Sequence, residues 1–404
     1  MQAPGGLAQE AYAAALASLP GVGPGWLAEL LSRRLPKDAW ELVISGQALP
    51  PKASRLRSDG DATAYAQWVK VAQLVDVGAL WQRCRDNSIC VEWLGAAGYP
   101  RALAGGPAPP GVLFSAGQLA WVERRPVVAV VGTRRCTPEG ASTAYHLARE
   151  LATAGVCVVS GLALGIDGAA HAGALEGFRV AVEGSGTAPT IAVEGPGAAP
   201  TVGVAASGVD VAYPRQHAAL WRQVVATGAV ISETPPGTPA QSWRFPARNR
   251  VIAGLARMVV VVESHVTGGS WHTVDAALRR GVEVAAVPGS VHSPASAGTN
   301  ALLRDGATPV RGAQDVLDAL GLQGGALAPP KAGDARSNGR GTAVEAPAPL
   351  AEKVLAALGW RPRCLEELVE RSGLPVGAAV VVLDQLEAAG EIVSSEDGWW
   401  CRRT

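Results

Sequence analysis

Residues 242–250 form the densest group of side chains in this sequence that could bind a nucleic acid. The segment holds three arginines, two aromatic residues and an asparagine: Trp243, Arg244, Phe245, Arg248, Asn249 and Arg250. Guanidinium groups match phosphate oxygens, and aromatic faces accept unstacked bases. The combination predicts a surface for single-stranded nucleic acid.

Structural alternatives stay open for this segment. Arg248 and Arg250 could instead pair with Glu263 or Asp275 and so fix the helix that follows. Phe245 could belong to the core rather than stack on a base. The sequence alone does not decide between these roles.

Three loops that follow expected strands are rich in glycine and small hydroxyl residues. They are residues 132–135, 161–167 and 263–270. Ligands of open parallel sheets bind beyond the carboxyl ends of the strands, where loop N–H groups can face an anion. The loops therefore predict a phosphate-binding rim.

Familiar catalytic patterns are missing from these loops. The first loop is not GxGxxG, and neither an acidic partner for a ribose nor a Walker A lysine accompanies it. Asp167 and His171 have i, i+4 spacing, but a carboxylate at a helix start is better suited to cap that helix. His265, His272 and His292 lack metal-ligand spacing. We therefore expect no catalytic residue, no metal and no cofactor.

Charge and cysteine usage limit the class of protein. Lys and Arg total 35 and balance 35 Asp and Glu, so a nucleic-acid surface must come from local clustering of arginines. The six cysteines show neither CxxC nor Cys/His ligand spacing, which predicts reduced thiols. No apolar stretch reaches the roughly 18 residues of a membrane helix, and no secretory signal is evident. We expect a cytoplasmic protein.

Short β-branched runs alternate with helical patterns from residue 126 to about residue 320. The runs are residues 127–131, 156–160, 229–232, 259–262 and 282–287, with at least one more strand between 180 and 213. The intervening helices are expected at residues 140–154, 168–175, 217–227, 247–256 and 272–280. This alternation predicts an α/β fold with an extended Rossmann-like, doubly wound parallel sheet.

An 11-residue segment occurs twice inside this region. Residues 180–190 read VAVEGSGTAPT and residues 191–201 read IAVEGPGAAPT. The repeat indicates a duplicated strand-and-turn unit. We expect one copy to supply a core strand and the other an edge hairpin or a loop.

The remaining patterns divide the chain into four parts. Residues 1–90 predict a helical domain, in which residues 19–25 join two helices as in a helix-hairpin-helix motif or form a plain glycine turn. Residues 91–323 hold the sheet. Residues 324–349 are rich in Gly, Ala and Pro, which predicts a disordered linker.

Residues 350–404 predict a winged helix. Three helical patterns precede two short strands joined at Asp397-Gly398. The candidate recognition helix, residues 376–389, contains no Lys or Arg, although duplex binding relies on cations that face phosphates. We therefore expect this helix to contact protein or to pack, rather than to enter a major groove.

Seven ordered segments resemble the DprA/Smf family over nearly the whole chain. They are YPRAL (99–103), PPGVLF (109–114), VVGTRR (130–135), SGLALGID (160–167) with His171, GVDVAYP (208–214), FPARNRVIAGL (245–255) and VPG (287–289). The resemblance implies a SAM-like helical domain, an extended Rossmann domain that dimerises and binds single-stranded DNA, and a winged helix. It also implies a non-enzymatic protein that protects DNA and loads the RecA recombinase on it during natural transformation and DNA recombination.

The resemblance further implies which residues bind DNA. Arg134 after the glycine turn, Arg215 after the Tyr-Pro pair and the Phe-Pro-x-Arg-Asn-Arg segment would form a basic pocket. Position 242, where relatives can carry a basic residue, is a serine, and Arg244 can replace the missing charge. The full implied set is Gly132, Thr133, Arg134, Ser160, Gly161, Arg215, Arg244, Phe245, Arg248, Asn249, Arg250, Gly269 and Ser270.

Two rival functions remain. A nucleotide-processing enzyme similar to the phosphoribohydrolases would share the fold and the phosphate loops, although residues 267–275 match its glycine-rich motif only loosely. The chain could also be an adaptor that binds proteins alone. Release of free base from a nucleoside monophosphate would identify the enzyme, and failure to bind an oligonucleotide would identify the adaptor.

Overall fold

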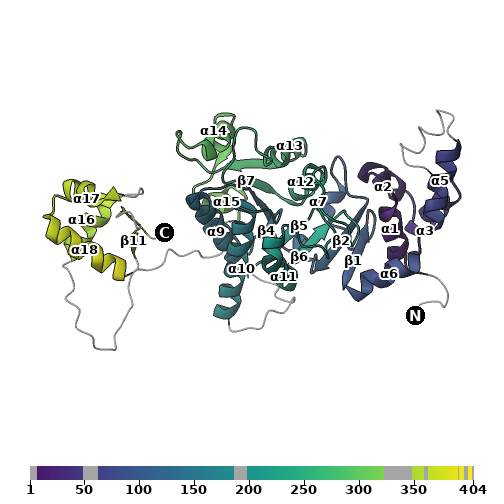
Figure 1. The fold of residues 1–404 in the computed structure, drawn as a ribbon, viewed down its shortest axis with the longest axis horizontal. Helices are drawn as coiled ribbons and strands as arrows, with labels where there is room; N and C mark the ends of the chain where they lie inside the picture. The colour runs from purple at the N-terminus through teal and green to yellow at the C-terminus, as the bar shows by residue number, and fades with distance from the viewer. Residues whose placement is uncertain are drawn as a thin grey trace. The chain divides into compact units, whose positions relative to one another are not determined.

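A computed structural model describes residues 7–48, 62–185, 198–322, 348–358, 363–389, 391–394 and 399–402. The chain divides into two compact units, residues 1–327 and residues 328–404. We call them the sheet unit and the winged-helix unit (Figure 1).

The sheet unit begins with helices that pack on the edge of its sheet. Those described are α1 (Gln9–Ser18), α2 (Pro24–Leu31), α3 (Pro36–Ile44), α5 (Ala62–Gln73) and α6 (Val77–Asp86). Leu16 and Leu30 belong to the same buried cluster as Phe114 of the sheet. A side chain at Gly111 would come within 2.7 Å of the Ala28 backbone, so α2 lies directly on the sheet edge. The helices and the sheet therefore share a core, while a domain boundary at residue 90 stays a prediction.

The sheet has nine strands among the described residues, in the order β1-β2-β6-β5-β4-β3-β7-β8-β9. Their bounds are β1 Ile89–Trp93, β2 Val112–Gly117, β3 Val127–Val131, β4 Cys157–Ser160, β5 Thr201–Val204, β6 Ala229–Ser232, β7 Met258–Val261, β8 Glu283–Ala286 and β9 Thr308–Pro309. The seven strands β6-β5-β4-β3-β7-β8-β9 pair in parallel with their neighbours. At the other edge, β2 pairs antiparallel with β6, and β1 pairs antiparallel with β2. The five predicted runs are confirmed to within one residue at each end.

Helices cover both faces of the sheet (Figure 1). Val128 and Val130 of β3 pack toward α9 (Pro138–Thr153), α10 (Ile166–Ser185) and α15 (Ala313–Ala319). Ala129 and Val131 of the same strand pack toward α12 (Arg244–Leu255), α13 (Trp271–Arg279) and α14 (Ala297–Arg304). Successive side chains of the strand thus point to opposite faces of the sheet, and helices bury both faces. This is the pattern of a doubly wound sheet, and the predicted fold class is confirmed. The remaining elements are α7 Arg101–Ala104, α8 Trp121–Arg124, η1 Arg215–His217, α11 Ala218–Thr227 and η2 Pro294–Ser296.

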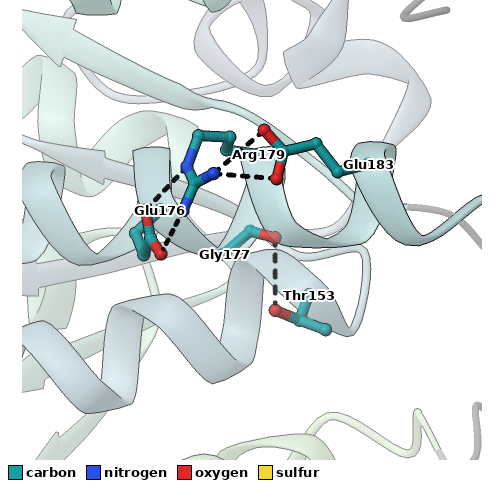
Figure 2. Close-up of polar contacts among 5 residues, drawn as sticks. All are labelled: Thr153, Glu176, Gly177, Arg179 and Glu183. Carbon is teal, nitrogen blue, oxygen red and sulfur yellow. Dashed lines mark hydrogen bonds and ion pairs between the residues drawn. The ribbon is translucent and has the colours of Figure 1, made fainter.

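The expected helix at residues 168–175 is longer than predicted, because α10 continues to Ser185. Arg179 explains part of this extension (Figure 2). Its guanidinium forms ion pairs with Glu176 at 2.7 Å and with Glu183 at 2.8 Å, one turn before and one turn after it. Such i, i+3 and i, i+4 pairs stabilise a helix. A hydrogen bond of 3.4 Å from Thr153 Oγ1 to the Gly177 carbonyl also ties α9 to α10.

This extension overturns the expectation that one copy of the repeat supplies a core strand. The first copy begins at Val180 inside α10, so its described part is helical. The core strand β5 begins only at Thr201, the last residue of the second copy. Residues 186–197, on which the expected edge hairpin or loop falls, lie outside the described residues.

The winged-helix unit has the predicted elements. They are α16 Ala348–Leu358, β10 Arg363–Cys364, α17 Leu365–Ser372, α18 Val376–Ala388, β11 Ile392–Ser394 and β12 Trp399–Arg402. The strands pair in the order β10-β12-β11, and the helices enclose an apolar core that includes Leu358, Leu368 and Leu383. The winged helix is confirmed. The predicted turn at residues 397–398 and nearly all of the predicted linker lie outside the described residues.

Candidate nucleic-acid interface

The loops after β3 and β7 meet at the centre of the sheet. The strand order continues from β3 to β4 on one side and from β7 to β8 on the other, which makes this point the topological switch. The Thr133 N–H donates to the Glu263 carbonyl at 2.8 Å and joins the two loops. A side chain at Gly132 would come within 2.7 Å of the same carbonyl. Glycine is therefore required where these loops approach each other.

A cavity of about 790 Å³ opens beyond these loops, and we call it the crevice. Residues of the predicted site that line it are Gly132, Thr133, Arg134, Phe245, Arg248, Asn249, Gly269 and Ser270. Arg135, His265 and His272 also line it, whereas Asp167 is the one carboxylate among its described lining residues. The balance of charge favours an anionic ligand.

Arg134, Phe245 and Tyr213 form a cation–aromatic cluster at the crevice. The Arg134 Cζ lies 4.7 Å from the centroid of the Phe245 ring, and the Tyr213 ring lies 5.7 Å from that ring on centroids. Arg134 is exposed, and no carboxylate of the described residues lies within ion-pair distance of it. Phe245 is only partly buried and Tyr213 is 46% exposed, so the core alternative for Phe245 is not what the structure shows. A cation and aromatic faces are thus presented to solvent together.

Arg248 is a buried residue in the wall of the crevice. Its Nη1 donates to the carbonyls of Gly161 and Val204, the latter at 2.6 Å, and its Nε donates to Asn249 Oδ1 at 3.1 Å. Burial lowers the pKa of Arg248 to about 10, although the nearby Asp167 opposes this shift. Burial likewise raises the pKa of Asp167, and Arg248 opposes that shift. The two groups therefore stabilise each other's charge in the interior.

The expected partner Glu263 serves another helix. Its carboxylate accepts hydrogen bonds from the Thr137 N–H at 2.9 Å and from Thr137 Oγ1 at 2.6 Å, at the start of α9. Arg250 instead forms an ion pair with Glu233. The suggested pairings of Arg248 and Arg250 with Glu263 or Asp275 are therefore wrong. Arg250 nevertheless has a structural role, because its ion pair with Glu233 links α12 to the segment after β6.

Several residues of the predicted site do not line the crevice. Arg250 is held by Glu233, and Ser160 is fully buried with its Oγ donating to the Val130 carbonyl at 2.6 Å. Gly161 is interior as well, because a side chain there would come within 2.2 Å of the Arg248 guanidinium. Ser160 and Gly161 thus shape the interior beside the crevice and do not face its space.

Arg244 and Arg215 lie apart from the crevice for different reasons. Arg244 lines another cavity on the far side of α12, and burial lowers its pKa. Arg215 is exposed in η1, two residues beyond Tyr213, but is not among the residues that line the crevice. Tyr213 was not among the predicted site residues, although it belongs to the Tyr-Pro pair that precedes Arg215.

Asp167 and His171 are interior residues of α10. The helix begins at Ile166, so Asp167 lies in its first turn rather than at the predicted cap position. His171 is fully buried, its Nδ1 lies 2.8 Å from Thr201 Oγ1, and burial lowers its pKa to about 3. Thr201 Oγ1 already donates to the Val158 carbonyl at 2.7 Å, so His171 Nδ1 donates to Thr201 and the ring is neutral. Within the described part of the chain, no three potential ligands gather as a metal site requires.

The fold and the crevice together define a class: a Rossmann-like protein with an arginine-lined, aromatic crevice and an attached winged helix. The model of the family described as DNA recombination-mediator protein A matches residues 91–321, and that of the DprA winged helix domain matches residues 339–398. The chain therefore belongs to the DprA/Smf family of DNA recombination mediators.

Individual relatives agree with this assignment. A putative DNA processing protein DprA of Mycobacterium tuberculosis is 38% identical over 295 residues, which cover 72% of this chain and 68% of the relative. Protein Smf of Escherichia coli is 34% identical over 308 residues and 74% of each chain. The crystal structure of DprA from Streptococcus pneumoniae superposes with a TM-score of 0.59 at 28% identity, covering 77% of this chain and 98% of that one. None of the described helices has the length and apolar composition needed to span a membrane.

Proposed function

We propose that this chain binds and protects single-stranded DNA in the crevice and loads the RecA recombinase onto it, without catalysing a reaction. The observation that carries the DNA part is the stack of Arg134 on Phe245, with Tyr213 beside it. The guanidinium can bind a phosphate while the aromatic rings accept unstacked bases. In a duplex the bases are already stacked and paired, so the same contacts select single strands.

The other parts of the proposal rest on family membership. Relatives of this chain are named DNA processing proteins, and the family model is described as a recombination mediator. RecA loading, a role in natural transformation and dimerisation through the sheet unit are expectations from that resemblance. A cytoplasmic location is an expectation from the sequence, in which no secretory signal and no membrane-spanning stretch is evident.

Fluorescence anisotropy with the full chain tests DNA binding. We expect a labelled oligo(dT) to bind more tightly than a blunt duplex of equal length, with little dependence on sequence, because stacking and backbone charge read no base edges. The affinity should also fall with salt, by a slope of about −0.7 per phosphate contact on logarithmic axes. Equal affinity for the duplex, or a flat salt response, would argue against the proposal.

The enzymatic rival is less well supported. Asp167 is the single carboxylate among the described lining residues of the crevice. It is buried, and the charge of the nearby Arg248 stabilises its ionised form. Hydrolysis of a glycosidic bond is usually carried out by two carboxylates. Incubation with nucleoside monophosphates, followed by chromatography, should release no free base. Steady release would replace the binding proposal with an enzymatic one.

A further inference from the structure

A second cavity, of about 630 Å³, lies on the other side of α12 from the crevice. The turn between α1 and α2, at residues 19–23, forms one wall, and the first turns of α12 form another. We call it the hairpin cavity. Residues of α12 alternate between the two spaces: Phe245 and Asn249 line the crevice, Ala247 and Val251 line the hairpin cavity, and Arg248 lines both. A single helix therefore separates the two cavities.

The hairpin cavity contains a second cation–aromatic pair. The Arg244 Cζ lies 4.9 Å from the centroid of the Trp243 ring, and both residues line this cavity. The indole is 62% exposed, which is unusual for so large an apolar side chain. Hydrogen bonds fix both groups, from Arg244 Nη1 to the Pro239 carbonyl at 3.0 Å and from Trp243 Nε1 to Gln241 Oε1 at 2.8 Å. The pair repeats the chemistry of Arg134 on Phe245.

The facing wall is fixed in place. Trp68 Nε1 donates to the Pro20 carbonyl at 2.9 Å, which anchors the turn between α1 and α2. Gly21, with a φ of 75°, supplies the left-handed residue that this turn needs. The close approach of α2 to Gly111 holds the turn against the sheet. The cavity is thus preformed, and residues 19–24 of the segment that the sequence singled out line it.

Charge in the hairpin cavity suits a nucleic-acid strand. Arg244 supplies the accessible cation, because Arg248 is buried and its charge is balanced by Asp167. The carboxylate of Glu233, which also lines the cavity, is neutralised by its ion pair with Arg250. The cavity also adjoins the N-terminus of α12, where helix N–H groups favour anions. Cations beside an exposed aromatic face match a phosphate that is followed by an unstacked base.

We propose that the hairpin cavity is a second subsite for the same DNA single strand that occupies the crevice. The strand crosses the start of α12, stacks one base on Trp243 and places a phosphate against Arg244. This inference rests on the proposed function of the crevice. It assigns the helical N-terminal region a direct part in holding the strand.

A length series of oligonucleotides tests the subsite in the full chain. Oligo(dT) from about 6 to about 30 nucleotides brackets the site size of a small single-strand site. Trp243→Ala should weaken binding of the long oligomers by about fivefold or more, since base stacking contributes on this scale. The shortest oligomer that binds should be unaffected, because it occupies the crevice alone. Trp243→Phe should restore most of the loss.

A charge variant provides the second readout. Arg244→Gln should lower the salt slope for long oligomers by about 0.7, the value of one phosphate contact on a single strand, and should leave the slope for the shortest unchanged. Arg222→Gln is the matched control, because Arg222 is an exposed arginine that lines neither cavity. Melting temperatures of all variants should equal that of the unaltered chain.

The outcomes separate the two proposals. If the unaltered chain binds DNA and the Trp243 and Arg244 variants match it at every length, the subsite is wrong and the crevice proposal stands. If Trp243→Ala weakens short and long oligomers equally, the residue acts on the crevice and the second subsite is again wrong. If the unaltered chain binds no single strand, both proposals fail.

Discussion

The crevice and the winged helix are both regions in which nucleic-acid binding would be sought, yet their side chains differ. The crevice presents an exposed Arg134 stacked on Phe245, at the carboxyl ends of central strands. On α18, by contrast, Val376 and Val381 are each 54% exposed and no residue is a lysine or arginine. Cations facing phosphates supply most of the affinity for nucleic acid. A winged-helix fold by itself therefore says little about DNA binding, and the side chains decide.

The interiors of the two units differ as well. The sheet unit buries Arg248, Asp167 and His171, whereas every described side chain that is polar or charged and fully buried lies outside the winged-helix unit. The winged-helix unit relies on an apolar core. Changes to buried ionisable groups should therefore affect only the sheet unit.

The largest expected effect follows from removing Arg248. Arg248→Met should destabilise the sheet unit by about 3 kcal/mol or more, because the buried carbonyls of Gly161 and Val204 lose their donor and the cation that opposes the raised pKa of Asp167 is removed. Urea denaturation, followed separately for each unit, should show the winged-helix transition unchanged. The double variant Arg248→Met, Asp167→Asn should recover part of the loss, and full additivity of the two single changes would contradict the coupling.

Acid should also distinguish the two units. The folded pKa of His171 is lowered to about 3 from its ordinary 6.5, so between these values the unfolded chain binds a proton that the folded chain does not. Stability of the sheet unit should then fall, as pH falls through this window, by up to about 1.4 kcal/mol per pH unit from this group.

His171→Asn provides the comparison for this prediction. The asparagine amide can still donate to Thr201, and subtracting its stability profile removes the opposite contributions of Asp167 and Glu233, whose pKa values are raised. The variant should show a flatter acid limb. The winged-helix unit contains no histidine, so its stability should show no histidine-dependent decrease between pH 6.5 and about pH 3. Parallel profiles for the variant and the unaltered chain would refute the assignment.

The smallest expected effect is that of removing the winged-helix unit on DNA binding. Deletion of residues 324–404 should change oligonucleotide affinity less than twofold, because α18 offers no cation to a phosphate. Circular dichroism must show that the shortened chain stays folded. A large loss of affinity in a folded truncation would move the binding site out of the crevice.

The sequence predicted five of the parallel strands well because each is a short β-branched run bounded by glycine or polar residues. It located β5 only to the region between residues 180 and 213, and it missed the two-residue β9. It did not predict β1 and β2, which pair antiparallel at the sheet edge beside α1 and are not short β-branched runs. The prediction for the repeat was wrong because its first residues are compatible with either a strand or a helix. Residues 180–185 look strand-like, but ion pairs of Arg179 continue α10 through them.

The sequence predicted part of the lining of the crevice. Arg134 and Phe245 lie in the crevice because strand ends and the start of α12 meet there, which the order of elements foretells. The sequence could not predict the ion pair of Arg250, because its partner Glu233 follows β6 and comes close to Arg250 only when the chain has folded. Likewise, the alternation of Arg244 and Phe245 between two cavities depends on where α1 and α2 pack.

The most direct test of the crevice as the DNA site is Arg134→Ala. We expect a melting temperature close to that of the unaltered chain, a loss of about 1–3 kcal/mol in oligonucleotide affinity and a salt slope smaller by roughly one phosphate contact. Arg134→Lys should recover only part of the affinity, because an ammonium keeps the charge without the bidentate geometry. Arg222→Ala, which removes an exposed arginine outside both cavities, should bind normally. An Arg134→Ala variant that binds DNA as well as the unaltered chain, or that unfolds, would contradict the account.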